Sequence, residues 1–171
     1  DNAFSHIHNL GLNGKSHNTT YNLSVGFLGQ QGMMKPANHD DYTRYNATLN
    51  LSTKVNDFLT VRGGAMYSDG TKRYPNSSTG FTSDPWLYLY RWSRLFPVGA
   101  QQNGVDVRDP YFDTKNANDA YKINRYLNLN LGTTFDISKN WDLKMDYAYS
   151  TQNNSDKSSM ATSTGAWHWY A

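Results

Sequence analysis

Apolar and polar residues alternate along much of this chain, with the period of a β-strand that has two unlike faces. In the longest run, residues 121–137, most odd positions are apolar and the even positions carry mainly amides, hydroxyls and Gly. Five shorter segments show the same alternation, so the sequence predicts about six strands. The shorter segments are residues 9–13, 21–27, 45–55, 59–67 and 141–149.

The connections between these segments are alternately short and long. The short polar turns are predicted at residues 14–18, 56–57 and 138–140, and the longer connections at 31–41, 69–120 and from 152 onward. Antiparallel strands with short turns at one end and long loops at the other are typical of an outer-membrane β-barrel. The segments also approach the ~9–11 residues with which a tilted strand crosses a bilayer. The predicted fold class is therefore all-β, an antiparallel wall of a transmembrane β-barrel.

The alternation divides the strand residues between two environments. Polar positions are expected to face an aqueous lumen and apolar positions to face lipid. The expected lumen-facing residues are Asn46, Asn50, Arg62, Asn128, Asn130, Lys144 and Asp146. The expected lipid-facing residues are Leu49, Leu51, Leu127, Leu129, Leu131 and Leu143.

A soluble β-sandwich or lipocalin-type barrel would alternate as well, but its outward face would be rich in Lys and Glu. Here the polar face carries mainly Asn, Ser, Thr and Gly, and aromatic residues stand near strand ends, as in interfacial girdles. Six strands are too few to close a membrane barrel, because the smallest use about eight. The abrupt chain ends, at Asp1 and Ala171, agree with a piece of a larger barrel. The girdle residues are Tyr21, Tyr45, Tyr67, Tyr121, Trp141 and Tyr149.

The composition of the chain excludes several other classes of protein. The chain has 171 residues, no Cys and a formal net charge of +2, so disulfide scaffolds and cysteine chemistry are excluded. No apolar run approaches the ~20 residues of a membrane-spanning helix. The near-neutral charge, without a Lys/Arg cluster in the sequence, argues against nucleic acid as a partner.

Two stretches, with a third in support, resemble the SusC/RagA family of TonB-dependent outer-membrane transporters of Bacteroidota. The first runs from His8-Asn9-Leu10 to Gln31-Gly32-Met33, and the second begins at Asp41-Tyr42 and ends at Phe58-Leu59. The third, Asp84-Pro85-Trp86-Leu87-Tyr88 to Phe96-Pro97, is similar to an aromatic loop of some members. Gly11, Asn13 and Lys15 depart from the family pattern, so the subgroup and its substrate stay open.

This resemblance implies a barrel of about 22 strands, within the size range of outer-membrane barrels. It also implies an N-terminal plug, a SusD-like surface lipoprotein as lid, and energy from TonB. Residues 1–171 would then be a partial barrel domain without plug or TonB box. Family members import oligosaccharides or peptides across the outer membrane of Gram-negative bacteria, and they suggest a dimer of transporter–lipoprotein pairs. In that fold the short turns face the periplasm and the long loops face outward.

The long connection at 69–120 is the most informative non-strand segment, because loops of this length are uncommon unless functional or disordered. Asp84-Pro85 is a good helix start, so a short helical turn is predicted near 84–95. Its aromatic rings could stack on sugars while its Arg residues donate hydrogen bonds, or the same rings could simply pack the loop. The substrate-binding candidates are Trp86, Tyr88, Tyr90, Arg91, Trp92 and Arg94.

Other polar clusters point to ordinary structural roles. The acids Asp106, Asp109, Asp113 and Asp119 match no EF-hand spacing and indicate a solvated acidic loop. His6 and His8 share a strand face, without a third ligand, and suit a barrel rim better than a metal. No catalytic motif appears in the sequence, so neither an enzyme, a cofactor nor a metal is expected.

The sequence therefore predicts active import of an oligosaccharide or peptide, with a SusD-like lipoprotein, TonB and membrane lipid as partners. Two alternatives stay open. A soluble carbohydrate-binding β-domain would use its aromatic residues as a stacking platform. A passive porin would have the same wall without a plug or a lid.

Overall fold

The computed structural model describes residues 3–76, 85–95 and 97–159, and most of them lie in β-strands. A six-stranded sheet accounts for nearly all of this β-structure, and two short helices and a two-stranded hairpin lie in the connection between its fourth and fifth strands. The strands of the large sheet are β1 (Ser5–Ser16), β2 (Thr19–Gln31), β3 (Asp41–Asn56), β4 (Leu59–Asn76), β7 (Asn118–Ser138) and β8 (Trp141–Ser158). The remaining elements are α1 (Pro85–Arg91), β5 (Gln101–Gln102), β6 (Val105–Asp106) and α2 (Pro110–Lys115).

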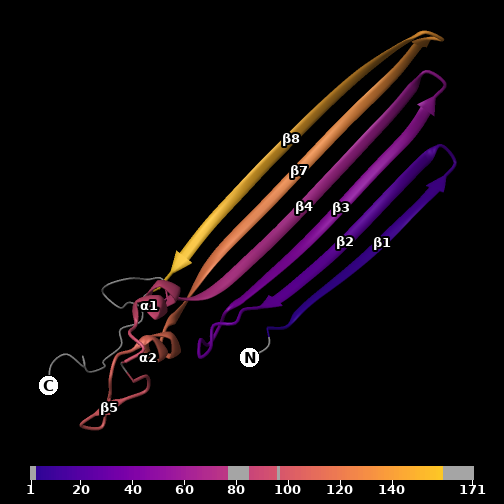
Figure 1. The fold of residues 1–171 in the computed structure, drawn as a ribbon. Coiled ribbons are helices and arrows are strands. Elements are labelled where there is room, and N and C mark those ends of the chain that lie inside the picture. The colour runs from indigo at the N-terminus through magenta and orange to yellow at the C-terminus, as the bar shows by residue number, and fades with distance from the viewer. Residues whose placement is uncertain (1–2, 77–84, 96, 160–171) are drawn as a thin grey trace.

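The large sheet is a single antiparallel layer with the strand order β1-β2-β3-β4-β7-β8 (Figure 1). Each strand pairs with its neighbour in the chain, apart from the step between β4 and β7, which spans the long connection. The prediction of six antiparallel strands is confirmed. The described strands do not close into a barrel, since β1 and β8 are paired on one side only.

The two ends of the sheet differ. Tight turns join β1 to β2, β3 to β4 and β7 to β8 at one end, which we call the turn end (Figure 1). The β2–β3 connection, at 32–40, and the β4–β7 connection, at 77–117, lie together at the opposite end, which we call the loop end (Figure 1). This arrangement agrees with the predicted alternation of short turns and long loops.

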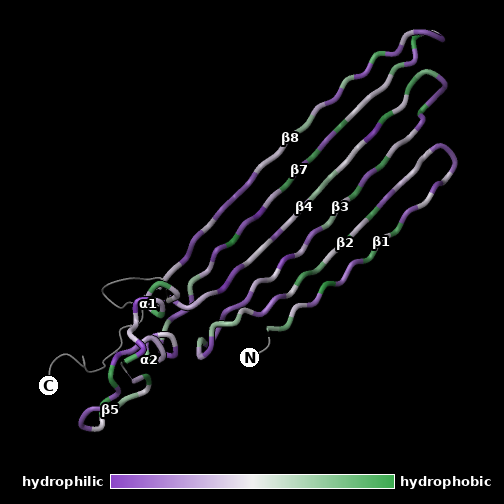
Figure 2. The backbone as a smooth tube through the Cα atoms, in the orientation of Figure 1, coloured by the Kyte–Doolittle hydropathy of each residue, from purple (hydrophilic) through white to green (hydrophobic). Residues whose placement is uncertain are grey.

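The pairing register keeps the two kinds of side chain on separate faces (Figure 2 shows the alternation along each strand). The apolar face is formed by the even positions of β1 and, away from the bulges, by the odd positions of the other five strands. The polar face is formed by the alternate positions. One row of the apolar face crosses all six strands as Leu12, Leu23, Leu49, Ala65, Leu129 and Tyr149.

No second layer of described residues covers the apolar face. Leu12 is 57% exposed, Leu131 is 53% exposed and Leu129 is 42% exposed, although all three stand in the middle of their strands. The buried apolar side chains among the described residues, Val107, Ala117, Ala120 and the prolines Pro75 and Pro110, lie in or beside the long connection. The sheet therefore has no hydrophobic core of its own.

The apolar face changes character toward the loop end. On β7 its apolar stretch runs from Leu127 to Ile137, close to the ~9–11 residues of a membrane-crossing strand. Beyond Leu127 the same face carries charged pairs: Arg125 Nε donates to Asp69 Oδ2 at 3.0 Å. Arg73 pairs with Asp41 through two contacts, Nε to Oδ2 at 3.1 Å and an Nη to Oδ1 at 3.0 Å.

The strands extend beyond their predicted ends at this side of the sheet. β4 continues to Asn76 and β7 begins at Asn118, so the connection spans 77–117 and the predicted loop boundaries of 69–120 were too wide. β8 likewise continues to Ser158, past the predicted start of the tail at 152. The reason is that both faces are polar in these extensions, so hydropathy alternation does not reveal them.

Candidate functional site

The polar face carries a ladder of amide side chains across neighbouring strands. Asn22 of β2 pairs in register with Asn50 of β3, and Asn130 of β7 lies in the same row beyond Gly64 of β4. A Cβ atom at Gly64 would overlap Asn130 Oδ1 and would lie 3.0 Å from Asn50 Oδ1. Gly64 thus leaves the space that lets the amides on both sides reach over β4.

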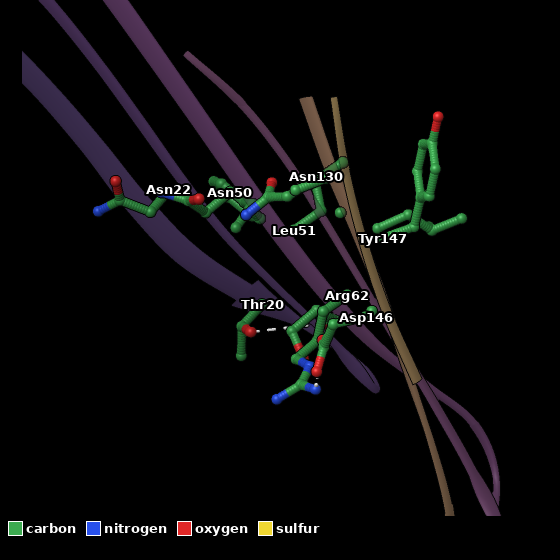
Figure 3. A pocket seen from close by; sticks show the side chains of 14 residues that line it. Thr20, Asn22, Asn50, Leu51, Arg62, Asn130, Asp146 and Tyr147 are labelled. Carbon is green, nitrogen blue, oxygen red and sulfur yellow. Dashed lines mark hydrogen bonds and ion pairs between the residues drawn. The ribbon is translucent and has the colours of Figure 1, made fainter. Parts of the chain in front are cut away.

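The next row toward the turn end carries charge. Arg62 of β4 donates to Asp146 of β8 at 3.3 Å, passing over Gly132 of β7, and Thr20 of β2 donates to the Ser52 carbonyl at 3.4 Å. These two rows contribute the polar side chains that line a hollow of about 630 Å³, reaching from β2 to β8 (Figure 3). Amides, hydroxyls and one ion pair give this hollow donors and acceptors for a polar solute.

The pairing register places odd-numbered and even-numbered wall residues of these strands on opposite faces of the sheet. Every residue predicted to face the lumen lies on the polar face, and every residue predicted to face lipid lies on the apolar face. The first set is Asn46, Asn50, Arg62, Asn128, Asn130, Lys144 and Asp146. The second set is Leu49, Leu51, Leu127, Leu129, Leu131 and Leu143.

The long connection folds around two buried carboxylates. Asp109 is fully buried and caps α2, accepting from the backbone N–H of Phe112 at 2.7 Å and from that of Gly99 at 2.5 Å. Asp113 is 2% exposed and accepts from Arg108 Nε at 3.1 Å. The interpretation of a solvated acidic loop was wrong for these two residues, because the connection uses them to satisfy its own backbone and guanidinium donors.

The structure does not gather the six loop candidates into one platform. Tyr88 of α1 and Trp92, the residue after the end of that helix, meet edge to face at 5.8 Å between ring centroids. Trp86 lies toward the β2–β3 connection, whereas Tyr90 is 87% exposed. The predicted helix is confirmed at Pro85–Arg91, while its expected cap, Asp84, lies outside the described residues. Arg91 ends this helix, and both it and Arg94 are exposed.

Trp86 and Leu89 of α1 line a pocket of about 220 Å³ shared with the β2–β3 connection. Met33, Met34 and Lys35 contribute from the β2–β3 side. Sequence reasoning did not select these three residues, because nothing in the chain shows that two connections so far apart would lie side by side. His39 Nδ1 lies 2.8 Å from Asp119 Oδ2 and ties the same connection to the start of β7.

The loop environment also changes proton affinities. Burial raises the pKa of Tyr88 to about 12, and the neighbouring Asp113 carboxylate acts in the same direction. Burial likewise raises the pKa of Asp113, although the hydrogen bond from Arg108 opposes it. Both shifts have the same physical cause, since a charged group loses hydration inside the loop.

We expect Tyr88 to remain protonated when other phenols ionise. Because its pKa is higher in the folded loop than the ordinary value of 10.0, its contribution to loop stability is complete below pH 10 and is lost as the pH rises toward about 12. In an ultraviolet titration of phenolate, Tyr88→Phe should remove an ionisation step near pH 12. Loss of a step near pH 10 instead would show that Tyr88 is hydrated in the folded loop.

Aromatic rings gather on the apolar face at the loop end of its apolar stretch. Phe27 of β2 lies 4.9 Å from Tyr45 of β3 and 5.4 Å from His6 of β1, measured between ring centroids. His6 also stacks on Phe4 at 5.5 Å, and His8 stands beside them. His6 and His8 thus belong to a cluster of rings, and the described residues contain no group of three or more His, Cys, Asp or Glu side chains able to hold a metal.

Comparisons with protein-family models, with curated proteins and with solved structures found no match to this chain. Among the residues that the structure describes, no helix is both long and apolar enough to pass through a membrane. The geometry defines the protein at the level of its fold, as a mostly β protein with a two-faced antiparallel sheet and structured connections at one end.

Proposed function

We propose that this chain forms part of the wall of an outer-membrane β-barrel in a TonB-dependent transporter of the SusC/RagA type. The transporter would import an oligosaccharide or peptide with a SusD-like lipoprotein as its lid. The observation that carries the proposal is the single-layer sheet with one exposed apolar face and one polar face. The sequence resemblance supplies the family, and the physical argument below concerns the membrane.

Hydrocarbon is the environment that suits the apolar face. Transfer of apolar surface out of water contributes roughly 25 cal/mol per Å², and this face leaves much of its Leu surface uncovered. Its apolar stretch is limited by the Arg125–Asp69 pair at the loop end, where charged groups would reach the lipid headgroups and water. A soluble carbohydrate-binding domain would instead need a second layer over these side chains.

The two sheet edges also bear on the proposal. The backbone groups along the outer sides of β1 and β8 have no strand partner among the described residues. In hydrocarbon each unpaired group costs several kcal/mol, so a membrane wall requires further strands to pair these edges. A barrel of the size found in this transporter family would provide them.

The polar face and the connections suit transport of a polar solute. The amides and hydroxyls of the hollow lined by Asn22, Asn50 and Asn130 would border an aqueous lumen. The structured β4–β7 connection would lie outside the cell, where Trp86 and Tyr90 could contact the solute as it arrives. No covalent step is required of any residue.

Membrane extraction combined with uptake tests this proposal. The protein should stay in the membrane fraction after an alkaline wash and dissolve only in detergent. Uptake of a fluorescently labelled oligosaccharide or peptide mixture should stop when an uncoupler collapses the proton gradient. Release by the alkaline wash would support a soluble domain, and uptake that survives the uncoupler would support a passive porin.

A further inference from the structure

Two lysines stand directly opposite each other on the polar face near the loop end. Lys72 of β4 pairs in register with Lys122 of β7, and both side chains are exposed. Their ammonium groups lie 5.8 and 6.0 Å from the ring centroid of Tyr74, so a single aromatic ring is within cation–π distance of both cations. This arrangement concentrates positive charge at one point of the sheet.

Like charges directly opposite each other on neighbouring strands are unfavourable. Among the described residues no carboxylate lies within ion-pair distance of Lys72 or Lys122. Asp156 of β8 is the register partner of Lys122 and does not form an ion pair with it. On the other face of the sheet, near the same end, the cations are paired: Arg73 and Arg125 each form an ion pair with an Asp.

A third cation adjoins the pair. Arg44 of β3 lies one polar-face row further toward the turn end, in register with Gly70 of β4, and its side chain is exposed and without an ion-pair partner among the described residues. Tyr42, in the row of Lys72, extends its hydroxyl over Gly70. Diagonal neighbours of this kind are about 7–8 Å apart, which is within reach of long side chains.

We propose that Arg44, Lys72 and Lys122 form a binding site for an acidic oligosaccharide, one whose sugars carry carboxylate or sulfate groups. The cations would bind the acidic groups, while Tyr42 and Tyr74 offer aromatic surface to the sugar rings. Neutral amides continue along the polar face toward the turn end, and such groups match sugar hydroxyls. The proposal rests on the proposed function, in which this face borders the lumen, and it narrows the substrate class.

Binding to the detergent-purified full-length protein tests the site. Calorimetry would use hexagalacturonate as the acidic sugar, maltohexaose as the neutral sugar and hexaglutamate as the acidic peptide. The double variant Lys72→Gln with Lys122→Gln should bind hexagalacturonate about tenfold more weakly. Lys139→Gln, at the turn end, removes one positive charge far from the site and should leave this affinity unchanged.

The remaining measurements separate the outcomes. Added salt should weaken hexagalacturonate binding to the unmodified protein, because the contacts are ionic. Removal of two opposed like charges should not impair folding, and a heat-modifiable gel band would verify that the double variant is folded. Equal affinity of the folded double variant and the unmodified protein would overturn the site, as would stronger binding of hexaglutamate than of hexagalacturonate. Either result would leave the detergent requirement and the energy dependence of uptake intact, so it would not contradict the proposed function.

Discussion

Leu129→Arg is expected, under the proposed membrane wall, to destabilise the protein by about 2–4 kcal/mol, the cost of an Arg at the lipid-facing midplane of a β-barrel. Leu129 lies in the central row of the apolar face and is 42% exposed. If hydrocarbon covers that row, the new guanidinium must stay in lipid or distort the wall to reach water. Denaturant unfolding in lipid vesicles measures the loss.

The neighbouring residue on the same strand supplies the control. Asn128→Arg introduces the same side chain one position earlier, on the polar face, and should change stability by less than about 1 kcal/mol. Equal losses for the two variants would mean that both faces have the same environment. That result would contradict the proposed membrane wall.

Asp109→Ala is expected to open the β4–β7 connection without affecting the large sheet. The substitution removes the buried carboxylate that accepts from the backbone N–H groups of Phe112 and Gly99, two part-buried hydrogen bonds. Loss of the helix cap and of the hydrogen bond from Gly99 together should cost about 2–3 kcal/mol of local stability. Amide hydrogen exchange at Phe112 and Gly99 should accelerate by roughly 30- to 150-fold.

Asp106→Ala is the matched control within the same connection. Asp106 is exposed and accepts from Gln101 Nε2 at 2.8 Å, a surface contact whose loss should cost less than about 1 kcal/mol. If the two Asp variants raised exchange to the same extent, the cap would contribute nothing beyond an ordinary surface hydrogen bond. The aromatic residues of the connection, such as the Tyr88–Trp92 pair, would then be the main source of its stability.

The central parts of the strands could be predicted from sequence because their two faces have unlike environments. Leu127, Leu129 and Leu131 alternate with Asn128 and Asn130, and this contrast defines both the strand and its parity. The pairing register keeps residues of the same parity together on one face of the sheet. On β4 the contrast is lost beyond Tyr67, so the outer part of that strand, as far as Asn76, could not be recognised.

The candidate site was harder to predict, because it depends on which strands meet and in which register. Lys72 was assigned to a loop, and its position opposite Lys122 follows from eighteen paired positions between β4 and β7. Asp109 and Asp113 were interpreted as solvated, since nothing in their spacing shows that the connection folds over them. Local pattern thus predicts which face a residue is on, whereas long-range pairing determines its neighbours.

β4 and β7 stay paired as far as Asn76 and Asn118, past the apolar stretch of the sheet. The two ends of the 77–117 segment are therefore held about 5 Å apart by a ladder that exists independently of the segment. Closure of such a loop costs little more when its length changes, because the entropic penalty rises only with the logarithm of length. The segment can consequently lengthen, shorten or be exchanged while the strands that carry it keep their register.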